Sequence, residues 1–263
     1  MSKPLAIDLF AGLGGWSEGL LAEGYDVVGF DIERHVYGEH RYPAQLVLQD
    51  VATIHGAQFK DAALIVASPP CQAYSYRAMP WSRARALPPP DNTLFEACFR
   101  IQREACEAAG RHIPMVVENV RGAQKWVGRA HWHFGSFYLW GDVPALMPIA
   151  RARAKVPGMG AGWRPPGHPD HVPGLAFNSH AERATKDTGG SWFNVAHNTT
   201  SGKGRNPDGR KQPGLSGPAC FDHGAASHSS KSKSRKFASA MIAKIPLVLS
   251  RHIARTYKPK VSA

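Results

Sequence analysis

The sequence has few cysteines, and they are irregularly spaced. Its 263 residues contain Cys71, Cys98, Cys106 and Cys220. Four cysteines cannot form a disulfide framework for a chain of this size, so we expect a reducing compartment. The first residues also lack the pattern of a signal peptide or a membrane span, since Lys3 is a single early charge and Asp8 interrupts the apolar stretch. The sequence predicts a soluble, cytoplasmic protein that does not bind a membrane.

Acidic residues are scarce in the second half of the chain. Residues 1–150 hold 13 Lys/Arg against 15 Asp/Glu, whereas residues 151–263 hold 19 against 5, within an overall charge of +12. This asymmetry indicates a nearly neutral catalytic body joined to a surface that binds a polyanion. A solvated basic tail is the alternative explanation of the charge.

Short apolar runs alternate with helical patterns in the first half, and no internal repeat is present. Strands are predicted at 4–10, 25–31, 45–50, 62–68, 113–120 and 133–140, and helices at 16–23 and 92–109. The alternation predicts an α/β fold with a doubly wound, mostly parallel sheet. We expect a catalytic domain over 1–155, an irregular basic lobe over 156–235, and a C-terminal helix over 236–263 that Pro246 kinks or divides.

Three successive strands end in signals for a nucleoside-bearing ligand. The first strand leads into the turn AGLGG, where glycines allow a ligand to approach the backbone. Ser17 replaces the third glycine of the dinucleotide fingerprint, which disfavours a nicotinamide cofactor. Asp31 ends the second strand, where a carboxylate can hold ribose hydroxyls, and Asp50 ends the third. Taken singly, either carboxylate could be solvated or cap a helix.

The segment SPPCQAYS, which follows the fourth strand, is the sharpest chemical signal. Pro69 and Pro70 stiffen the chain before Cys71, which places the thiol at the carboxyl edge of the sheet rather than in the core. The next strand ends in ENV, so Glu118 reaches the same edge. The sequence therefore predicts that a thiol and a carboxylate converge there.

These motifs together resemble the C5-cytosine DNA methyltransferase family. DLFAGLGG is similar to the family's first motif, and Asp31, Asp50, PPCQ, DNTLF (91–95) and ENV follow in the family's order. The resemblance implies S-adenosylmethionine as the methyl donor and duplex DNA as the partner. It implies a cofactor pocket formed by Phe10, Ala11, Gly12, Leu13, Gly14, Gly15, Asp31, Ile32, Asp50, Val51, Pro70 and Leu94.

The same resemblance implies catalytic roles for Cys71 and Glu118, and the chemistry agrees with them. Carbon 5 of cytosine is too weak a nucleophile to take a methyl group until a thiolate adds at position 6. Glu118 would stabilise the resulting charge at ring nitrogen 3. Because a stacked duplex hides the face of the ring, the target base must be flipped out.

Other features of the family are harder to align. Arginines that help to hold the flipped base could correspond to Arg129, Arg151 or Arg153. Residues 156–235 occupy the place of the target recognition lobe. We expect no metal, although His168, His171, Cys220 and His223 have spacings that could chelate zinc, because no second CxxC supports a site.

Two rival functions remain at this point. One is an RNA (tRNA) cytosine-5 methyltransferase with the same chemistry, and the other is a catalytically silent DNA-binding relative. Intact PPCQ and ENV argue against the silent relative. We expect a monomer, and whether it has a cognate restriction enzyme stays open.

Overall fold

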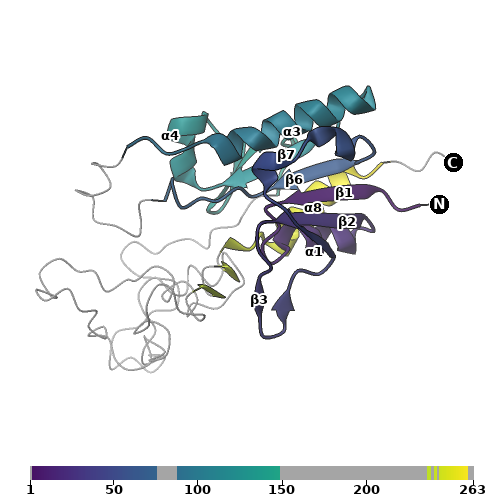
Figure 1. Cartoon of the computed structure of the whole chain (residues 1–263), viewed down its shortest axis with the longest axis horizontal. Helices are drawn as coiled ribbons and strands as arrows, with labels where there is room; N and C mark the ends of the chain where they lie inside the picture. Colours follow the sequence, from purple (N-terminus) through teal and green to yellow (C-terminus); the bar gives the residue numbers. More distant parts are fainter. Residues whose placement is uncertain (1, 76–87, 149–235, 238–239, 242, 260–263) are drawn as a thin grey trace, which may run out of the picture. The chain divides into compact units, whose positions relative to one another are not determined.

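The computed structural model describes residues 2–75, 88–148, 236–237, 240–241 and 243–259. Seven strands of the described residues form one sheet in the order β5-β2-β1-β6-β7-β9-β8 (Figure 1). The sheet belongs to a compact unit that spans Met1–Ile149 and Lys244–Ala263. No helix in the described part of the chain is long and apolar enough to cross a membrane.

The five parallel strands confirm the predicted doubly wound, mostly parallel sheet. They are β1 (Leu5–Leu9), β2 (Asp26–Asp31), β5 (Gln45–Leu48), β6 (Leu64–Ala67) and β7 (Met115–Asn119). Every residue of β6 and β7 is buried, as is typical of strands with both faces covered. The strand order reverses between β1 and β6, and such a switch point is where open α/β sheets bind ligands.

The last two strands differ from the prediction. We expected a single strand over 133–140, but the structure has β8 (Trp132–Phe134) and β9 (Phe137–Gly141), which pair antiparallel. Gly135, with φ of 60°, and Ser136 form the two-residue turn between them. A glycine at the first turn position permits a tight turn that matches the twist of the strands. The prediction of one continuous strand was wrong.

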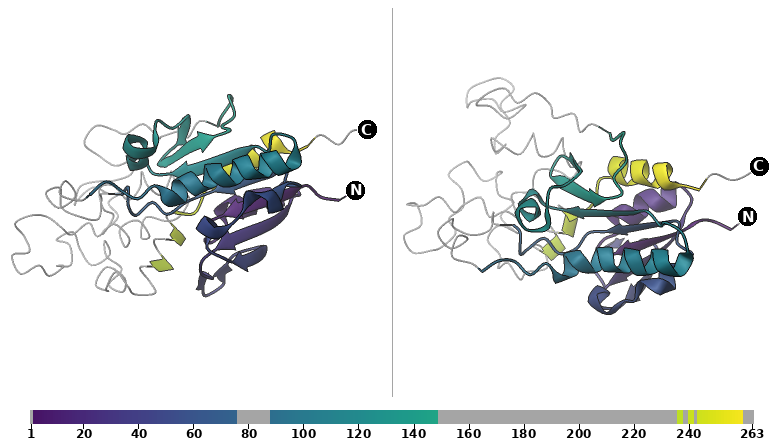
Figure 2. Two further views of the ribbon diagram at one scale, coloured as in Figure 1. Left: turned by 45° about the horizontal axis from the view of Figure 1, so that its top comes forward. Right: turned by 90° about the horizontal axis from the view of Figure 1, so that it is seen from above.

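Helices cover both faces of the sheet (Figure 2). On one face, α1 (Gly15–Ala22) packs against α8 (Leu247–Tyr257). The approach is so close that a Cβ added at Gly19 would lie 2.3 Å from Ser250 Oγ. On the other face lies α3 (Thr93–Ala109), which packs against the short helices η1 (Val51–Thr53) and η2 (Gly56–Phe59).

The C-terminal segment shows why α8 closes the sheet domain. Pro246 precedes its first residue, so the helix begins at Leu247, in agreement with the prediction that Pro246 kinks or divides the C-terminal helix. Glu23, at the end of α1, binds α8 through Arg251 Nε at 2.6 Å and Arg255 Nε at 2.9 Å. The sequence predicts α8 from its apolar spacing, but not these ion pairs.

Candidate active site

The glycine-rich turn connects β1 to α1 at the carboxyl edge of the sheet. Phe10, Gly12 and Gly14 have positive φ angles of 59°, 51° and 75°. Only glycine adopts such angles without strain, which accounts for two of the three positions. The space beside Gly12 is open, because an added Cβ would meet only the Phe10 carbonyl, at 3.9 Å. The backbone of this turn is therefore accessible to a ligand.

Asp31 lies at the end of β2, directly beside this turn. Its Oδ2 accepts a 2.8 Å hydrogen bond from the Gly12 amide, and its Oδ1 accepts one of 3.2 Å from the Glu33 amide. Burial alone would raise the pKa of Asp31, but the hydrogen bonds from His35, Gly12 and Glu33 together outweigh it and lower that pKa. The carboxylate is therefore ionised at neutral pH. Next to it, the apolar side chain of Ile32 is 73% exposed.

The other predicted cofactor residues lie around the same edge with different exposures. Asp50 is exposed and caps η1, because its Oδ1 accepts a 2.9 Å hydrogen bond from the Ala52 amide. Val51 is buried in the core, so little of its side chain can touch a ligand. Pro70 is exposed after β6, and Leu94 is half-buried in the first turn of α3. The structure thus brings most of the predicted set to one edge, with Val51 beneath the surface.

Cys71 lies in the turn that follows β6. Its carbonyl accepts hydrogen bonds of 3.0 Å from the amides of both Tyr74 and Ser75, which wind the chain into a single tight turn. The Cys71 side chain is half-buried. The thiol is therefore held at the sheet edge by a defined backbone turn, as the prolines before it predict.

Glu118 lies on the neighbouring strand β7 and reaches the same edge. Val117 pairs with Ala67 of β6, so Glu118 is one residue beyond the last paired position. Glu118 is only 9% exposed. The next residue, Asn119, donates a 3.0 Å hydrogen bond from Nδ2 to the Pro69 carbonyl and ties β7 to the turn that carries Cys71. Neighbouring strands therefore hold the predicted thiol and carboxylate.

A comparison of the sequence with protein-family models shows which family this part of the chain resembles. Residues 5–126 match the family model "C-5 cytosine-specific DNA methylase". This part of the chain is similar to the C-5 cytosine-specific DNA methylase family. The match is a little under half of the chain and includes the glycine-rich turn, Asp31, Asp50, Cys71 and Glu118. Members of this family use S-adenosylmethionine as the methyl donor.

Three solved methyltransferase structures are partly similar to this chain. One is described as a DNA modification methyltransferase encoded within an E. coli prophage; it is 27% identical over 48% of this chain and 34% of its own, with a TM-score of 0.34. The Dnmt2 methyltransferase of S. pombe is 16% identical over 47% of this chain and 36% of its own, with a TM-score of 0.31. The EhMeth methyltransferase of Entamoeba histolytica is 17% identical over 48% of this chain and 40% of its own, with a TM-score of 0.30.

The matched region is short relative to these proteins. This chain covers between about a third and two fifths of the length of those three structures. Among curated proteins, none matches the sequence.

The matched region holds the Cys71 turn with side chains that the sequence did not reveal. The hydroxyl of Tyr74 donates a 2.9 Å hydrogen bond to Asn92 Oδ1, and Asn92 Nδ2 donates one of 3.4 Å to the Trp126 carbonyl. The Tyr74 carbonyl also packs on Gly122, where an added Cβ would approach it to 2.3 Å. These contacts join parts of the chain between 18 and 48 residues apart, so no local spacing predicts them.

A second feature that the sequence did not reveal lies beneath the glycine-rich turn. Asp8 is fully buried in β1, and its Oδ2 accepts a 2.6 Å hydrogen bond from Ser17 Oγ, which is also 2.6 Å from the Tyr42 hydroxyl. Burial raises the pKa of Asp8 to about 7, and the nearby charge of Asp31 adds to the rise. A polar residue inside the apolar run LAIDLF was the only sequence signal for this cluster.

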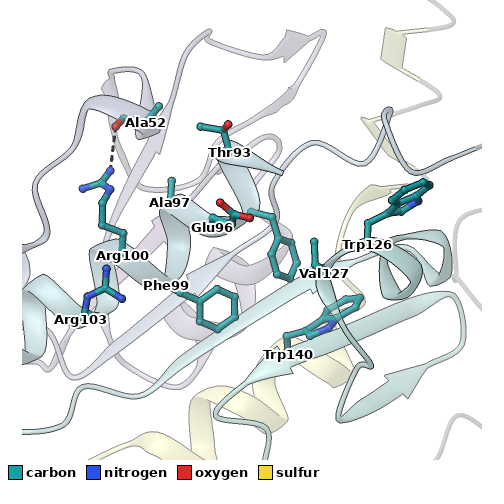
Figure 3. Close-up of a pocket in the computed structure, with 11 residues that line it drawn as sticks. Ala52, Thr93, Glu96, Ala97, Phe99, Arg100, Arg103, Trp126, Val127 and Trp140 are labelled. Atoms are coloured by element: carbon teal, nitrogen blue, oxygen red, sulfur yellow. Dashed lines mark hydrogen bonds between the residues drawn. The ribbon is translucent and has the colours of Figure 1, made fainter. Parts of the chain in front are cut away.

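One cavity in the described part of the chain lies away from Cys71 and Glu118. A cavity of about 720 Å³ runs along α3 between Ala52 on one side and Trp126 and Trp140 on the other (Figure 3). Its lining includes neither Cys71 nor Glu118. Arg129 is exposed in the loop before β8, whereas Arg151, Arg153 and the four His and Cys residues of the zinc alternative lie outside the described residues. Among the described residues, no cluster of three potential metal ligands occurs.

Proposed function

We propose that this protein transfers a methyl group from S-adenosylmethionine to carbon 5 of a cytosine within a specific sequence of duplex DNA. The observation that carries the proposal is the order of three adjacent strands. β1 leads to the glycine-rich turn, β6 to Cys71, and β7 to Glu118, on both sides of the switch point. A ligand turn, a nucleophile and an acid–base group on neighbouring strand ends are the parts that this reaction needs.

The residues around the glycine-rich turn fit the methyl donor. The ionised carboxylate of Asp31 would accept hydrogen bonds from the ribose hydroxyls, and the exposed Ile32 would pack against the adenine. The exposed carboxylate of Asp50 would accept a hydrogen bond from the adenine amino group. The open backbone at Gly12 leaves room for the ligand to approach. The bound sulfonium would supply the methyl group.

The chain's own groups then perform the chemistry on the flipped base. The Cys71 thiolate adds to position 6 and forms a carbon–sulfur bond, while Glu118 stabilises the charge that develops at ring nitrogen 3. Carbon 5, now nucleophilic, takes the methyl group as the sulfur–methyl bond breaks, and the donor leaves as a neutral thioether. A solvent base then takes the proton on carbon 5, which restores the double bond and expels Cys71 as a thiolate. The hydrogen bond between Asn119 and Pro69 maintains the relative position of the two groups.

A covalent trap tests this proposal directly. When 5-fluorocytosine occupies the target, methyl transfer proceeds but fluorine cannot leave carbon 5 as a proton does. Enzyme and DNA should stay joined through Cys71, and the adduct should survive denaturing electrophoresis. Cys71→Ser should give neither adduct nor 5-methylcytosine, because a hydroxyl is far less ionised than a thiol near neutral pH. Methylation by Cys71→Ser at the wild-type rate would contradict the mechanism.

The RNA and the silent-relative alternatives predict different outcomes in the same assay. An RNA cytosine methyltransferase would modify a transfer RNA in preference to duplex DNA when both compete for limiting enzyme. A silent DNA-binding relative would bind DNA but form no adduct with either polymer. A monomeric state and residues 156–235 as the recognition lobe belong to the proposal as further expectations, whereas the target sequence and a cognate restriction enzyme stay open.

A further inference from the structure

The stretch between Glu118 and Asp142 contains no carboxylate. We name residues 119–141 the basic hairpin segment; it holds Arg121, Lys125 and Arg129, together with His131 and His133. Over the whole of residues 1–150, acidic residues outnumber basic ones. The positive charge of the basic hairpin segment is therefore a local cluster in a region that otherwise has an excess of acidic residues. The same segment carries three tryptophans, two phenylalanines and one tyrosine.

Its cationic side chains lie on the surface. Arg121, Lys125 and Arg129 are all exposed, and Lys125 Nζ lies 4.6 Å from the ring centroid of Trp126. In the hairpin, the ring of His133 stacks on Tyr138 with centroids 5.1 Å apart and planes 17° apart. Exposed basic groups interleaved with aromatic rings are typical of surfaces that bind nucleic acids.

The register of the strands locates this surface relative to the site. Glu118 pairs with Leu139 of β9, which in turn pairs with Trp132 of β8. Because neighbouring strands lie about 4.8 Å apart, Trp132 is about 10 Å from Glu118 across the sheet. Trp132 is 39% exposed on the outermost strand. On the other side of Glu118, the carbonyl of Trp126, the neighbour of Lys125, accepts a 3.4 Å hydrogen bond from Asn92, which also binds Tyr74 of the Cys71 turn. The segment therefore borders the Cys71 turn, and its charges act over a Debye length of about 8–10 Å at moderate salt.

We propose that the basic hairpin segment is a second nucleic-acid contact surface, which binds the phosphate backbone of the duplex beside the Cys71 and Glu118 edge. It adds to the recognition lobe and rests on the proposed function for the identity of the polymer. A duplex carries one negative charge per about 1.7 Å of its axis, so several phosphates lie within reach of these cations. The segment supplies affinity and orientation, whereas it does not read the sequence.

The salt dependence of DNA binding tests this surface. The variant Lys125→Ala/Arg129→Ala loses two exposed cations, and each phosphate contact contributes about 0.9 to the slope of log K against log salt. The slope measured by fluorescence anisotropy with duplex DNA should fall by about 2. Between 50 and 200 mM KCl, the affinity of the variant should accordingly decrease about tenfold less than that of the wild type.

A matched variant controls for the loss of charge. Lys3→Ala/Lys60→Ala also removes two exposed cations, but these lie near the amino ends of β1 and β6, and its slope should equal that of the wild type. An unchanged slope for the hairpin variant, or an equal decrease for both variants, would overturn the proposal. Circular dichroism and thermal melting establish that both variants are folded.

Parallel measurements separate this inference from the proposed function. A wild-type adduct with 5-fluorocytosine DNA, combined with an unchanged slope in the hairpin variant, contradicts the surface alone. A reduced slope without any wild-type adduct supports the surface and contradicts the proposed chemistry. A reduced slope with duplex RNA but not with duplex DNA overturns the assignment to DNA.

Discussion

Tyr74 and Asn92 form a partly buried hydrogen bond of 2.9 Å between the turn that carries Cys71 and the residue that precedes α3. Tyr74 is only 3% exposed, and its amide also donates to the Cys71 carbonyl. The pair therefore fixes the reactive turn to the helix layer. Because α3 packs on the sheet through its apolar face, this hydrogen bond attaches the turn to the rigid core.

Tyr74→Phe should reduce methyl transfer more than it reduces stability. The change removes one hydroxyl and leaves Asn92 Oδ1 without this donor, which costs about 1 kcal/mol of unfolding free energy. A small displacement of the Cys71 turn should lower kcat by about 10- to 100-fold, because reactive groups tolerate little misplacement. Urea unfolding and single-turnover methylation measure the two effects.

A matched tyrosine provides the control for this experiment. Tyr25 is also buried, and its hydroxyl donates a 2.9 Å hydrogen bond to the Ala254 carbonyl in α8, on the other face of the sheet. Tyr25→Phe should show a similar loss of stability while kcat stays within about twofold. Equal effects of both changes on kcat would mean that Tyr74 contributes only to stability.

Asp31→Asn and Asp50→Ala should each weaken the binding of S-adenosylmethionine by about 1–3 kcal/mol, the cost of losing a partner in a polar site. Isothermal titration calorimetry measures the affinity. Asp50→Ala should also lose about 1 kcal/mol of stability, because Asp50 caps η1. Unchanged affinity in both variants would remove these two residues from the pocket.

The parallel strands could be predicted because their apolar runs are buried on both faces and end in recognisable turns. Glycines at 24 and 110 marked the ends of two helices correctly. The hairpin at Gly135 was missed, although Gly-Ser between two aromatic runs is a known hairpin signal. In that segment the aromatic residues on both sides of the turn concealed the break between two strands.

The candidate site was predictable only in part, for a physical reason. Cys71, Glu118 and Asp31 are residue types suited to this chemistry that lie at strand ends, and parallel strands bring such ends to one edge. Asn119 lies in the ENV motif, but its contact with Pro69 depends on the register between β6 and β7. Positions that support the reactive groups depend on tertiary distances, which the spacing of residues along the chain does not encode.

Asp8 should make the stability of the protein depend on pH. Its pKa is raised from 3.8 to about 7, so the folded state retains a proton that the unfolded state releases. The contribution of protonated Asp8 to the free energy of unfolding is fully present below about pH 4 and decreases between pH 4 and 7. Above pH 7 it is lost. The loss is at most on the order of 4 kcal/mol. Urea unfolding of the wild type at pH 5 and pH 8 should reveal it.

Asp8→Asn removes the titrating group while an amide oxygen can still accept the hydrogen bond from Ser17. The stability of the variant should therefore vary less between pH 5 and pH 8 than that of the wild type. A wild-type profile and a variant profile with the same slope would show that Asp8 ionises normally in the folded protein.

Deletion of residues 160–230 should abolish the sequence preference of DNA binding but preserve cofactor binding. The compact unit of Met1–Ile149 and Lys244–Ala263 contains the sheet, α8 and all predicted cofactor residues. Non-specific binding should persist at low salt through the basic hairpin segment. Competition between target and scrambled duplexes measures the preference, and retained specificity in a folded deletion would place recognition elsewhere.

Glu118→Gln should lower the rate of methyl transfer by about 10²–10⁴-fold, the usual contribution of a positioned acid or base. The amide has the same shape, so the pairing of β7 and the hydrogen bond from Asn119 to Pro69 should persist. The affinity for S-adenosylmethionine should accordingly stay nearly unchanged, because Glu118 acts on the cytosine. Glu107→Gln, an exposed change on α3, serves as the matched control and should leave the rate intact. Single-turnover formation of 5-methylcytosine distinguishes the cases: a rate for Glu118→Gln equal to that of the control would remove Glu118 from the chemistry, even with Cys71 as the nucleophile.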